Sequence, residues 1–260
     1  MNEQEIKVLV TDLDGTLLAE DRDDISQKLQ IFLKKWVASG GYWVVASGRP
    51  EDSLKDCFRF WDVRPTAFIA QNRYIFYQDR DEFTAEVLYI PDPSWNRYMR
   101  RDEQLLAEDK PKIFEKLARW AAGRYAVEEI TDDWIKFYTV EGARSAGEQL
   151  DEITGEKTQV LRNGCYLGLM PGRAGKGPAL ERLFGRQLKA TAEEVLCVGD
   201  SDNDRDMLDG SYGFHSAAPG SAEPEIKAAV RDNGGTIIQS DLDVGLNLIL
   251  ETKGKEGKKR

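Results

Sequence analysis

The chain has 260 residues, which is long enough to bury a full hydrophobic core in one large domain or in two smaller ones. Hydrophobic residues make up 41% of it and charged residues 32%, a balance typical of a soluble globular protein. The formal net charge of -10 argues against nucleic-acid binding, because no basic stripe is available to displace counterions from phosphates.

Membrane and secretory roles are also disfavoured. No stretch approaches the roughly 20 apolar residues that span a bilayer, and the N-terminal "MNEQEIK" lacks the apolar segment of a secretory signal. Cys57, Cys165 and Cys197 show no paired spacing, which favours free thiols over disulfides or a zinc site. We therefore expect a cytoplasmic protein that has neither a membrane nor a nucleic acid as its partner.

The N-terminal part of the chain alternates between strand and helix patterns. Apolar runs predict strands over residues 6–12, 42–47 and 66–70. Helical spacing of apolar residues predicts one helix over 25–37 and a second that starts at Pro50. This alternation is typical of a mostly parallel sheet covered by helices on both faces.

A different pattern occupies residues 80 to 171. It begins with the strand-like run "FTAEVLYI" (83–90). It also includes "RYAVEEI" and "WIKFYTV", two strand-like runs separated only by "TDD", which predict an antiparallel hairpin. The alternating pattern returns after it, with a helix around 180–188 and the strand "EVLCVG". We therefore predict an α/β fold whose parallel-sheet domain is formed by residues 1–79 and 172–260, with an α+β insertion over 80–171.

Four short stretches carry the chemistry of a candidate site. "TDLDGT" (11–16), "SGRP" (47–50) and "GDSDND" (199–204) each follow a predicted strand, and "AGKG" (174–177) opens a helix. Ligands of open α/β sheets bind beyond the carboxyl ends of the strands, so we expect these stretches to meet in one site.

A calcium-binding loop is the first alternative for the aspartates. Asp200, Asp202 and Asp204 fall at the first, third and fifth places of an EF-hand loop. However, Arg205 stands where that loop needs glycine, and Ser211 stands where it needs glutamate. The remaining alternative, ordinary turn chemistry, would require two coincidences, because two aspartate clusters end long apolar strands.

The lysine at position 176 is unusual for its place. A phosphate-binding P-loop is excluded, because no glycine lies five places before Gly175 and Gly177 replaces the required serine or threonine. A cation is locally unfavourable at the positive end of a helix dipole. A residue that breaks a local rule without evident gain indicates function.

Together these residues predict phosphoryl transfer. Asp12 can attack phosphorus as an ionised carboxylate, and Asp14 can protonate the leaving group and then activate water. Several carboxylates would repel a phosphate dianion, so a divalent cation is required, and Mg²⁺ suits oxygen ligands. We predict a metal site of Asp12 and Asp200, in which Asp204 supports the metal indirectly.

Phosphate binding is predicted at the other two stretches. Ser47, Gly48 and Arg49 offer a hydroxyl, backbone amides and a cation at a helix start, which form a natural cradle for an anion. Lys176 is expected to contact the phosphoryl oxygens, with Ser47 and Lys176 acting as catalytic residues beside the two aspartates. Asn203 is predicted to bind substrate.

The order of these motifs resembles that of the haloacid dehalogenase superfamily of phosphohydrolases. "DLDGT", "SGR", the isolated Lys176 and "GDSDND" match its four motifs. The resemblance implies a Rossmann-like core, a covalent intermediate on Asp12, and a magnesium ion held by Asp12, the Asp14 backbone carbonyl and Asp200.

The insertion is similar to the α/β cap domain of the type IIB members, which include hexose-phosphate and sucrose-phosphate phosphatases and phosphomannomutases. "LMPGRAGKGPAL" (169–180) is similar to the segment around the lysine in sucrose-phosphate phosphatases. Many relatives have Asn-Gly-Ala after the third strand, whereas Asn72 is followed here by Arg73 and Tyr74, so the resemblance leaves the role of Asn72 open.

The sequence therefore predicts a magnesium-dependent phosphatase of a small phosphorylated metabolite, with a sugar phosphate as the favoured class. Two alternatives remain open. A sugar phosphomutase would use the same aspartates but return the phosphoryl group to a sugar, and a catalytically silent metal-binding module would not turn over at all.

Overall fold

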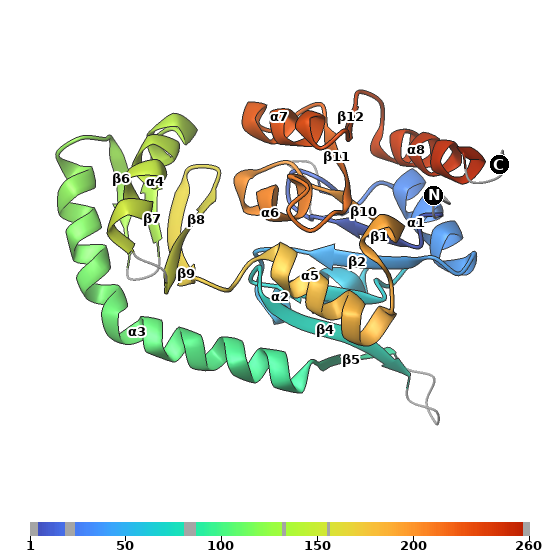
Figure 1. Ribbon diagram of the computed structural model, residues 1–260, viewed down its shortest axis with the longest axis horizontal. Coiled ribbons are helices and arrows are strands. Elements are labelled where there is room, and N and C mark those ends of the chain that lie inside the picture. Colours follow the sequence, from blue (N-terminus) through green and yellow to red (C-terminus); the bar gives the residue numbers. More distant parts are fainter. Residues whose placement is uncertain (1–4, 19–23, 81–86, 132–133, 155–156, 257–260) are drawn as a thin grey trace. The chain divides into compact units, whose positions relative to one another are not determined.

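The computed structural model describes residues 5–18, 24–80, 87–131, 134–154 and 157–256 (Figure 1). The chain divides into two compact units. The core unit comprises residues 1–92 and 175–260, and the inserted unit comprises residues 93–174. Among the described residues, no helix combines the length and apolar character needed to cross a bilayer.

An eight-stranded sheet forms the centre of the core unit, in the order β12-β11-β10-β1-β2-β3-β4-β5. All neighbours pair in parallel from β12 to β3, whereas β4 and β5 are antiparallel. The strands are β1 (Val8–Thr11), β2 (Tyr42–Ala46), β3 (Ala67–Ala70), β4 (Tyr74–Arg80), β5 (Val87–Pro91), β10 (Val195–Val198), β11 (His215–Pro219) and β12 (Thr236–Ile238).

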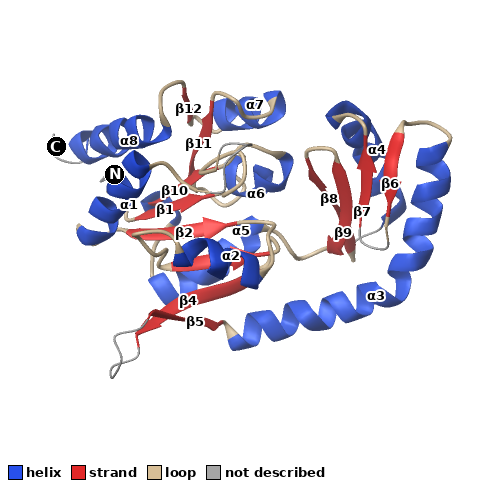
Figure 2. Ribbon diagram, turned by 180° about the vertical axis from the view of Figure 1, so that it is seen from behind, coloured by secondary structure: helices blue, strands red, loops and turns tan. Residues whose placement is uncertain are grey.

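Helices cover both faces of this sheet, and the predicted α/β class is confirmed. Figures 1 and 2 show α2 and α5 on opposite faces. Every residue of β1 is buried, as expected for a strand between parallel neighbours that is covered on both sides. The helices are α1 (Gln27–Ala38), α2 (Glu51–Arg59), α5 (Lys176–Leu183), α6 (Arg205–Leu208), α7 (Pro224–Asp232) and α8 (Leu242–Glu256).

The inserted unit has its own antiparallel sheet and its own hydrophobic core. Its strands run in the order β6-β7-β9-β8, and β6 and β7 form the predicted hairpin. Phe114, Phe137, Leu150 and Leu167 are among the buried residues that join α3 and α4 to the sheet. The elements are α3 (Pro93–Ala122), β6 (Val127–Ile130), β7 (Trp134–Phe137), α4 (Val140–Thr154), β8 (Thr158–Asn163) and β9 (Tyr166–Pro171).

One segment lies in the core unit although the sequence pattern placed it in the insertion. Residues 87–91 form β5, the edge strand that pairs with β4. The ring of Tyr89 lies 5.0 Å from that of Phe68 and 5.9 Å from that of Phe58, measured between centroids. These aromatic contacts pack Tyr89 of the strand against the core unit, and the units divide after Asp92. Of the stretch "FTAEVLYI" read as a strand, residues 83–86 lie outside the described residues.

Candidate active site

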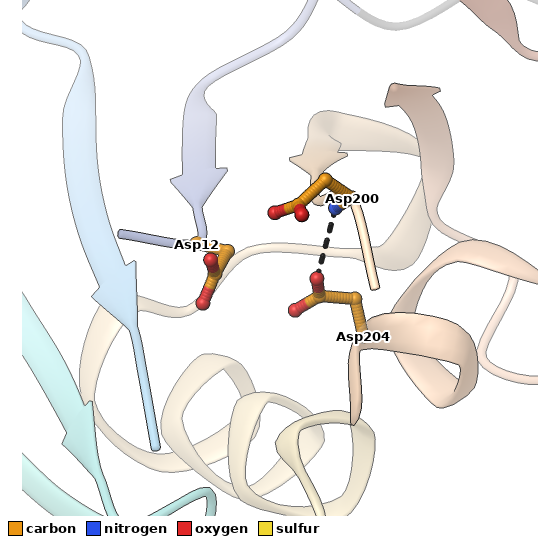
Figure 3. Close-up of side chains that lie close together, drawn as sticks. All are labelled: Asp12, Asp200 and Asp204. Atoms are coloured by element: carbon orange, nitrogen blue, oxygen red, sulfur yellow. Dashed lines mark hydrogen bonds between the residues drawn. The ribbon is translucent and has the colours of Figure 1, made fainter. Parts of the chain in front are cut away.

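Three of the predicted stretches meet at the carboxyl end of the core sheet. Asp12 directly follows β1, Ser47 follows β2, and Asp200 lies two residues beyond β10. The backbone N–H of Asp12 donates to the carbonyl of Val198 at 2.8 Å, which ties the ends of β1 and β10 together. Figure 3 shows Asp12, Asp200 and Asp204 turned toward one another, with one ligand oxygen from each within 4.8 Å of the others.

Lys176 joins two of these carboxylates. Its Nζ lies 2.5 Å from Asp12 Oδ1 and 2.5 Å from Asp204 Oδ1, and its side chain has no exposed surface. Burial alone would lower the pKa of Lys176, but the charges of Asp12 and Asp204 outweigh burial and raise it. The residue is therefore a permanent ammonium ion held between two buried carboxylates.

Asp204 organises the loop that carries Asp200. Its Oδ2 accepts the backbone N–H of Asp200 at 2.9 Å (Figure 3). The same oxygen accepts the backbone N–H of Ser201 at 3.1 Å, while Oδ1 accepts Lys176. The carboxylate is fully buried. Because protein donors occupy both oxygens, Asp204 shapes the site rather than offering a free ligand atom.

Asp200 lies against the loop after β1. Its Oδ1 accepts the hydroxyl of Thr16 at 2.8 Å, and its Oδ2 lies only 2.3 Å from the position that a Cβ on Gly15 would occupy. Burial, followed by the nearby charge of Asp204, raises the pKa of Asp200 to about 7. The sequence predicts no role for Thr16, which ends the stretch "TDLDGT", and only the fold reveals its contact with Asp200.

A divalent cation fits this set of groups. Burial also raises the pKa of Asp12 above its usual range; Lys176 opposes that shift, and Asp204 and Asp200 add to it. Three carboxylates against one ammonium ion leave an excess of negative charge. Among the described residues, none donates a hydrogen bond to Asp12 Oδ2 or Asp200 Oδ2. Carboxylate oxygens of this kind are ligands that hard cations prefer.

Asp14 and Arg49 are paired with each other. Arg49 Nε donates to Asp14 Oδ2 at 2.8 Å, and Nη2 donates to Oδ1 at 2.5 Å. The two side chains are 49% and 29% exposed, respectively, so the pair is far more accessible to solvent than the buried cluster. Asp14, the predicted acid, and Arg49, the predicted substrate-binding cation, are therefore bound to each other in this structure.

The loops after β2 and β3 bring polar groups beside the cluster. Ser47 Oγ accepts the N–H of Arg49 at 3.1 Å, and the N–H of Asn72 donates to the Ser47 carbonyl at 2.9 Å. Asn203 Nδ2 lies 3.5 Å from Asn72 Oδ1, and a Cβ on Gly48 would lie 3.4 Å from Asn72 Nδ2. Asn72, which had no assigned role, thus joins the predicted residues. Its place two residues after the third strand is the signal that the sequence offers.

A family model described as haloacid dehalogenase-like hydrolase matches the chain over residues 9–88 and 70–237. The phosphoglycolate phosphatase of Pyrobaculum aerophilum is 27% identical over 226 residues, covering 86% of this chain and 87% of that protein. The 5-amino-6-(5-phospho-D-ribitylamino)uracil phosphatase of Bacillus subtilis is 24% identical over 210 residues, covering 78% of this chain and 80% of that protein.

Solved structures show the same fold. The sucrose-phosphatase of Synechocystis, determined in complex with sucrose and phosphate, has a TM-score of 0.68 at 19% identity. The similarity covers 96% of this chain and 99% of the sucrose-phosphatase, so it extends through both units.

The close approach of Gly15 to Asp200 gives a testable prediction. Gly15→Ala adds a methyl group at φ 82° and forces the Asp200 carboxylate aside. We expect its affinity for a divalent cation, measured by isothermal titration with magnesium chloride, to fall by about 10–100-fold.

Gly40→Ala is the matched control. Gly40 has a φ of 94°, but a Cβ there would meet nothing within 4 Å. Both variants should lose about 1–2 kcal/mol of stability through backbone strain, and only Gly15→Ala should lose affinity. Equal affinities in the two variants would contradict this role of Gly15.

Proposed function

Because the chain belongs to the haloacid dehalogenase-like hydrolase family, we propose that its core unit hydrolyses a small phosphoric monoester in a magnesium-dependent reaction through phosphorylation of Asp12. The observation that carries the proposal is the buried Lys176 ammonium between Asp12 and Asp204, with Asp200 beside them. The phosphatase activity named for two relatives supports hydrolysis as the reaction.

Asp12 is assigned as the nucleophile. Lys176 holds its Oδ1, which leaves Oδ2 to attack phosphorus. A bond forms between Oδ2 and phosphorus as the bond from phosphorus to the leaving oxygen breaks. Lys176 remains charged throughout and offsets the negative charge that the phosphoryl group brings into the site.

Asp14 is assigned as the acid and then the base. It gives a proton to the leaving oxygen, and it later takes one from the water that attacks the phosphorylated Asp12 and releases phosphate. Both Asp14 oxygens are occupied by Arg49, so the ion pair must open before Asp14 can transfer a proton. Arg49 is then released to contact the phosphoryl oxygens, which is its predicted binding role.

Asp12 and Asp200 are assigned as the carboxylates that would hold magnesium, Asp200 through Oδ2 and Asp12 through Oδ1, so that Asp12 Oδ2 stays free to attack phosphorus; the family pattern adds the Asp14 backbone carbonyl. When bound, the ion would neutralise the phosphoryl oxygens and the carboxylates that face them. Asp204 holds Asp200 in place by accepting the backbone N–H of Asp200. Ser47 is assigned to the phosphoryl oxygens.

Two further groups complete the phosphate cradle. The backbone at Gly48 and the amide of Asn203 are assigned to the substrate, and Asn72 lies next to both. Because residue 48 is glycine, no side chain at this position separates Asn72 and Asn203 from the proposed phosphate site.

A sugar phosphate is proposed as the substrate class. The inserted unit carries Trp134, Lys136 and Tyr166 on one face of its sheet, while Ile135 and Leu167 turn to its core. The ring centroids of Trp134 and Tyr166 lie 5.2 Å apart, and Lys136 Nζ lies 5.7 Å from the Tyr166 ring. Aromatic rings with a nearby cation suit a polar ring-shaped substrate. The sucrose-phosphatase likeness favours the same class.

Asp12→Asn should abolish turnover and leave the fold intact, because the amide is a poor nucleophile of nearly the same shape. With an aryl phosphate and magnesium, we expect kcat to fall by on the order of 10⁴-fold or more. Asp202→Asn is the matched control, because this carboxylate lies in the same loop as Asp200 and pairs with Arg205. Activity of Asp12→Asn within about tenfold of wild type would refute the covalent mechanism.

The proposed metal dependence predicts loss of activity in excess chelator and recovery when magnesium is added. Asp200→Ala should raise the magnesium concentration needed for half-maximal activity far more than Ser47→Ala, because Ser47 is assigned to phosphate and not to the ion. Full activity in chelator, or equal effects of the two substitutions, would be incompatible with the assignment.

A turnover screen tests the substrate class. Hexose or disaccharide phosphates should have higher kcat/KM than nucleotides or phosphopeptides. Tyr166→Ala should lower kcat/KM for the best sugar phosphate but not for an aryl phosphate. Phe60→Ala, which removes an aromatic ring that is 80% exposed on the core unit, should change neither value. Nucleotides or phosphopeptides that outperform every sugar phosphate would overturn this class and leave the phosphatase chemistry standing.

A further inference from the structure

A fourth carboxylate lies close to Lys176 without touching its ammonium group. Asp206, in α6, accepts the backbone N–H of Gly177 at 2.9 Å through Oδ2. Gly177 is the next residue after Lys176 in the first turn of α5. The other oxygen of Asp206, Oδ1, is buried and has no hydrogen-bond partner among the described residues. The bond to Gly177 is therefore the fixed polar contact of this side chain.

The two glycines around Lys176 leave room for this carboxylate. A Cβ on Gly175 would lie 2.4 Å from Asp206 Oδ2, and a Cβ on Gly177 would lie 3.2 Å from Asp206 Cγ and 2.4 Å from the Tyr212 ring. Gly175 also has a φ of 146°, which side-chain-bearing residues rarely adopt. The sequence "GKG" is thus explained by the approach of Asp206 on both sides of the lysine.

The start of α5 needs such a contact. Gly175 provides no side-chain cap, so the N–H groups of the first turn depend on an acceptor from elsewhere in the chain. A lysine at this end is locally unfavourable because the helix dipole is positive there. The chain also passes from the inserted unit to the core unit between residues 174 and 175, immediately before Lys176.

We propose that Asp206 is a positioning residue, which holds the first turn of α5 through the Gly177 N–H and thereby fixes Lys176 between Asp12 and Asp204. The consequence for catalysis rests on the proposed function, but the placement of Lys176 does not. Asp206 contacts neither Asp12 nor the phosphate and acts only through the helix backbone.

The placement of Lys176 can be tested without any turnover. A proton–nitrogen correlation spectrum of the lysine ammonium groups should contain a protected Lys176 signal, assigned by its absence in Lys176→Met. We expect Asp206→Ala to shift or broaden that signal beyond detection. Asp206→Asn should retain it, because the side-chain oxygen of asparagine can still accept the Gly177 N–H.

Asp209→Ala is the matched control. Asp209 accepts the N–H of Ser211 at 2.9 Å, so this variant loses a similar bond three residues away from Asp206 and outside α5. The Lys176 signal should be unchanged in it. An unchanged signal in Asp206→Ala, or loss of the signal in a folded Asp206→Asn protein, would overturn the proposal.

Phosphatase activity is the second measurement that tests the role of Asp206. With an aryl phosphate and magnesium, Asp206→Ala should lower kcat by on the order of 10–100-fold, the scale on which misplacement of a catalytic group acts. Asp206→Asn should restore most of it. A wild-type protein without phosphatase activity would refute the proposed function, whereas the ammonium spectra would still decide the role of Asp206. Equal kcat values in wild type and Asp206→Ala would remove the positioning role in catalysis.

Discussion

The buried ion triad of Lys176, Asp12 and Asp204 is the interaction on which the rest of the site depends. Burying any one of these charges alone would cost much free energy. Removing one partner of a buried ion pair strongly destabilises the folded protein, because it leaves a buried charge without compensation. The three groups come from the end of β1, the start of α5 and the turn before α6. The sheet, the helix and the loop must therefore all be in place together.

The triad also determines where the remaining groups lie. Asp204 uses its second oxygen to hold the backbone of Asp200, and Asp200 in turn lies against Gly15. On the other side of β1, the parallel strand β2 also contributes to the site, because the loop after β2 carries Ser47. A fixed cluster with excess negative charge supports the proposed cation requirement, and the more exposed Asp14 becomes available for the proposed proton transfer once Arg49 releases it.

Much of this arrangement could be predicted from sequence, and the family resemblance of the motifs is confirmed. Buried strands that end in polar residues place Asp12 and Asp200 correctly, since parallel strands align their carboxyl ends. The edge strand β5 could not be placed, because its membership depends on ring contacts of Tyr89. Nor does any periodic pattern reveal the pairing of Asp14 with Arg49, which lie 35 residues apart. Asn72 adopts a φ of 58° that sequence spacing does not encode.

The most direct test of the account is to identify the phosphorylated residue during turnover. A reaction with magnesium and an aryl phosphate, whose leaving group needs little protonation, would be quenched in acid, digested and analysed by mass spectrometry, in wild type and in Asp14→Asn. The account predicts a phosphoryl group on Asp12, which accumulates in Asp14→Asn because water is no longer activated. Turnover with no phosphorylated peptide in either protein, or with the phosphoryl group on another residue, would contradict it.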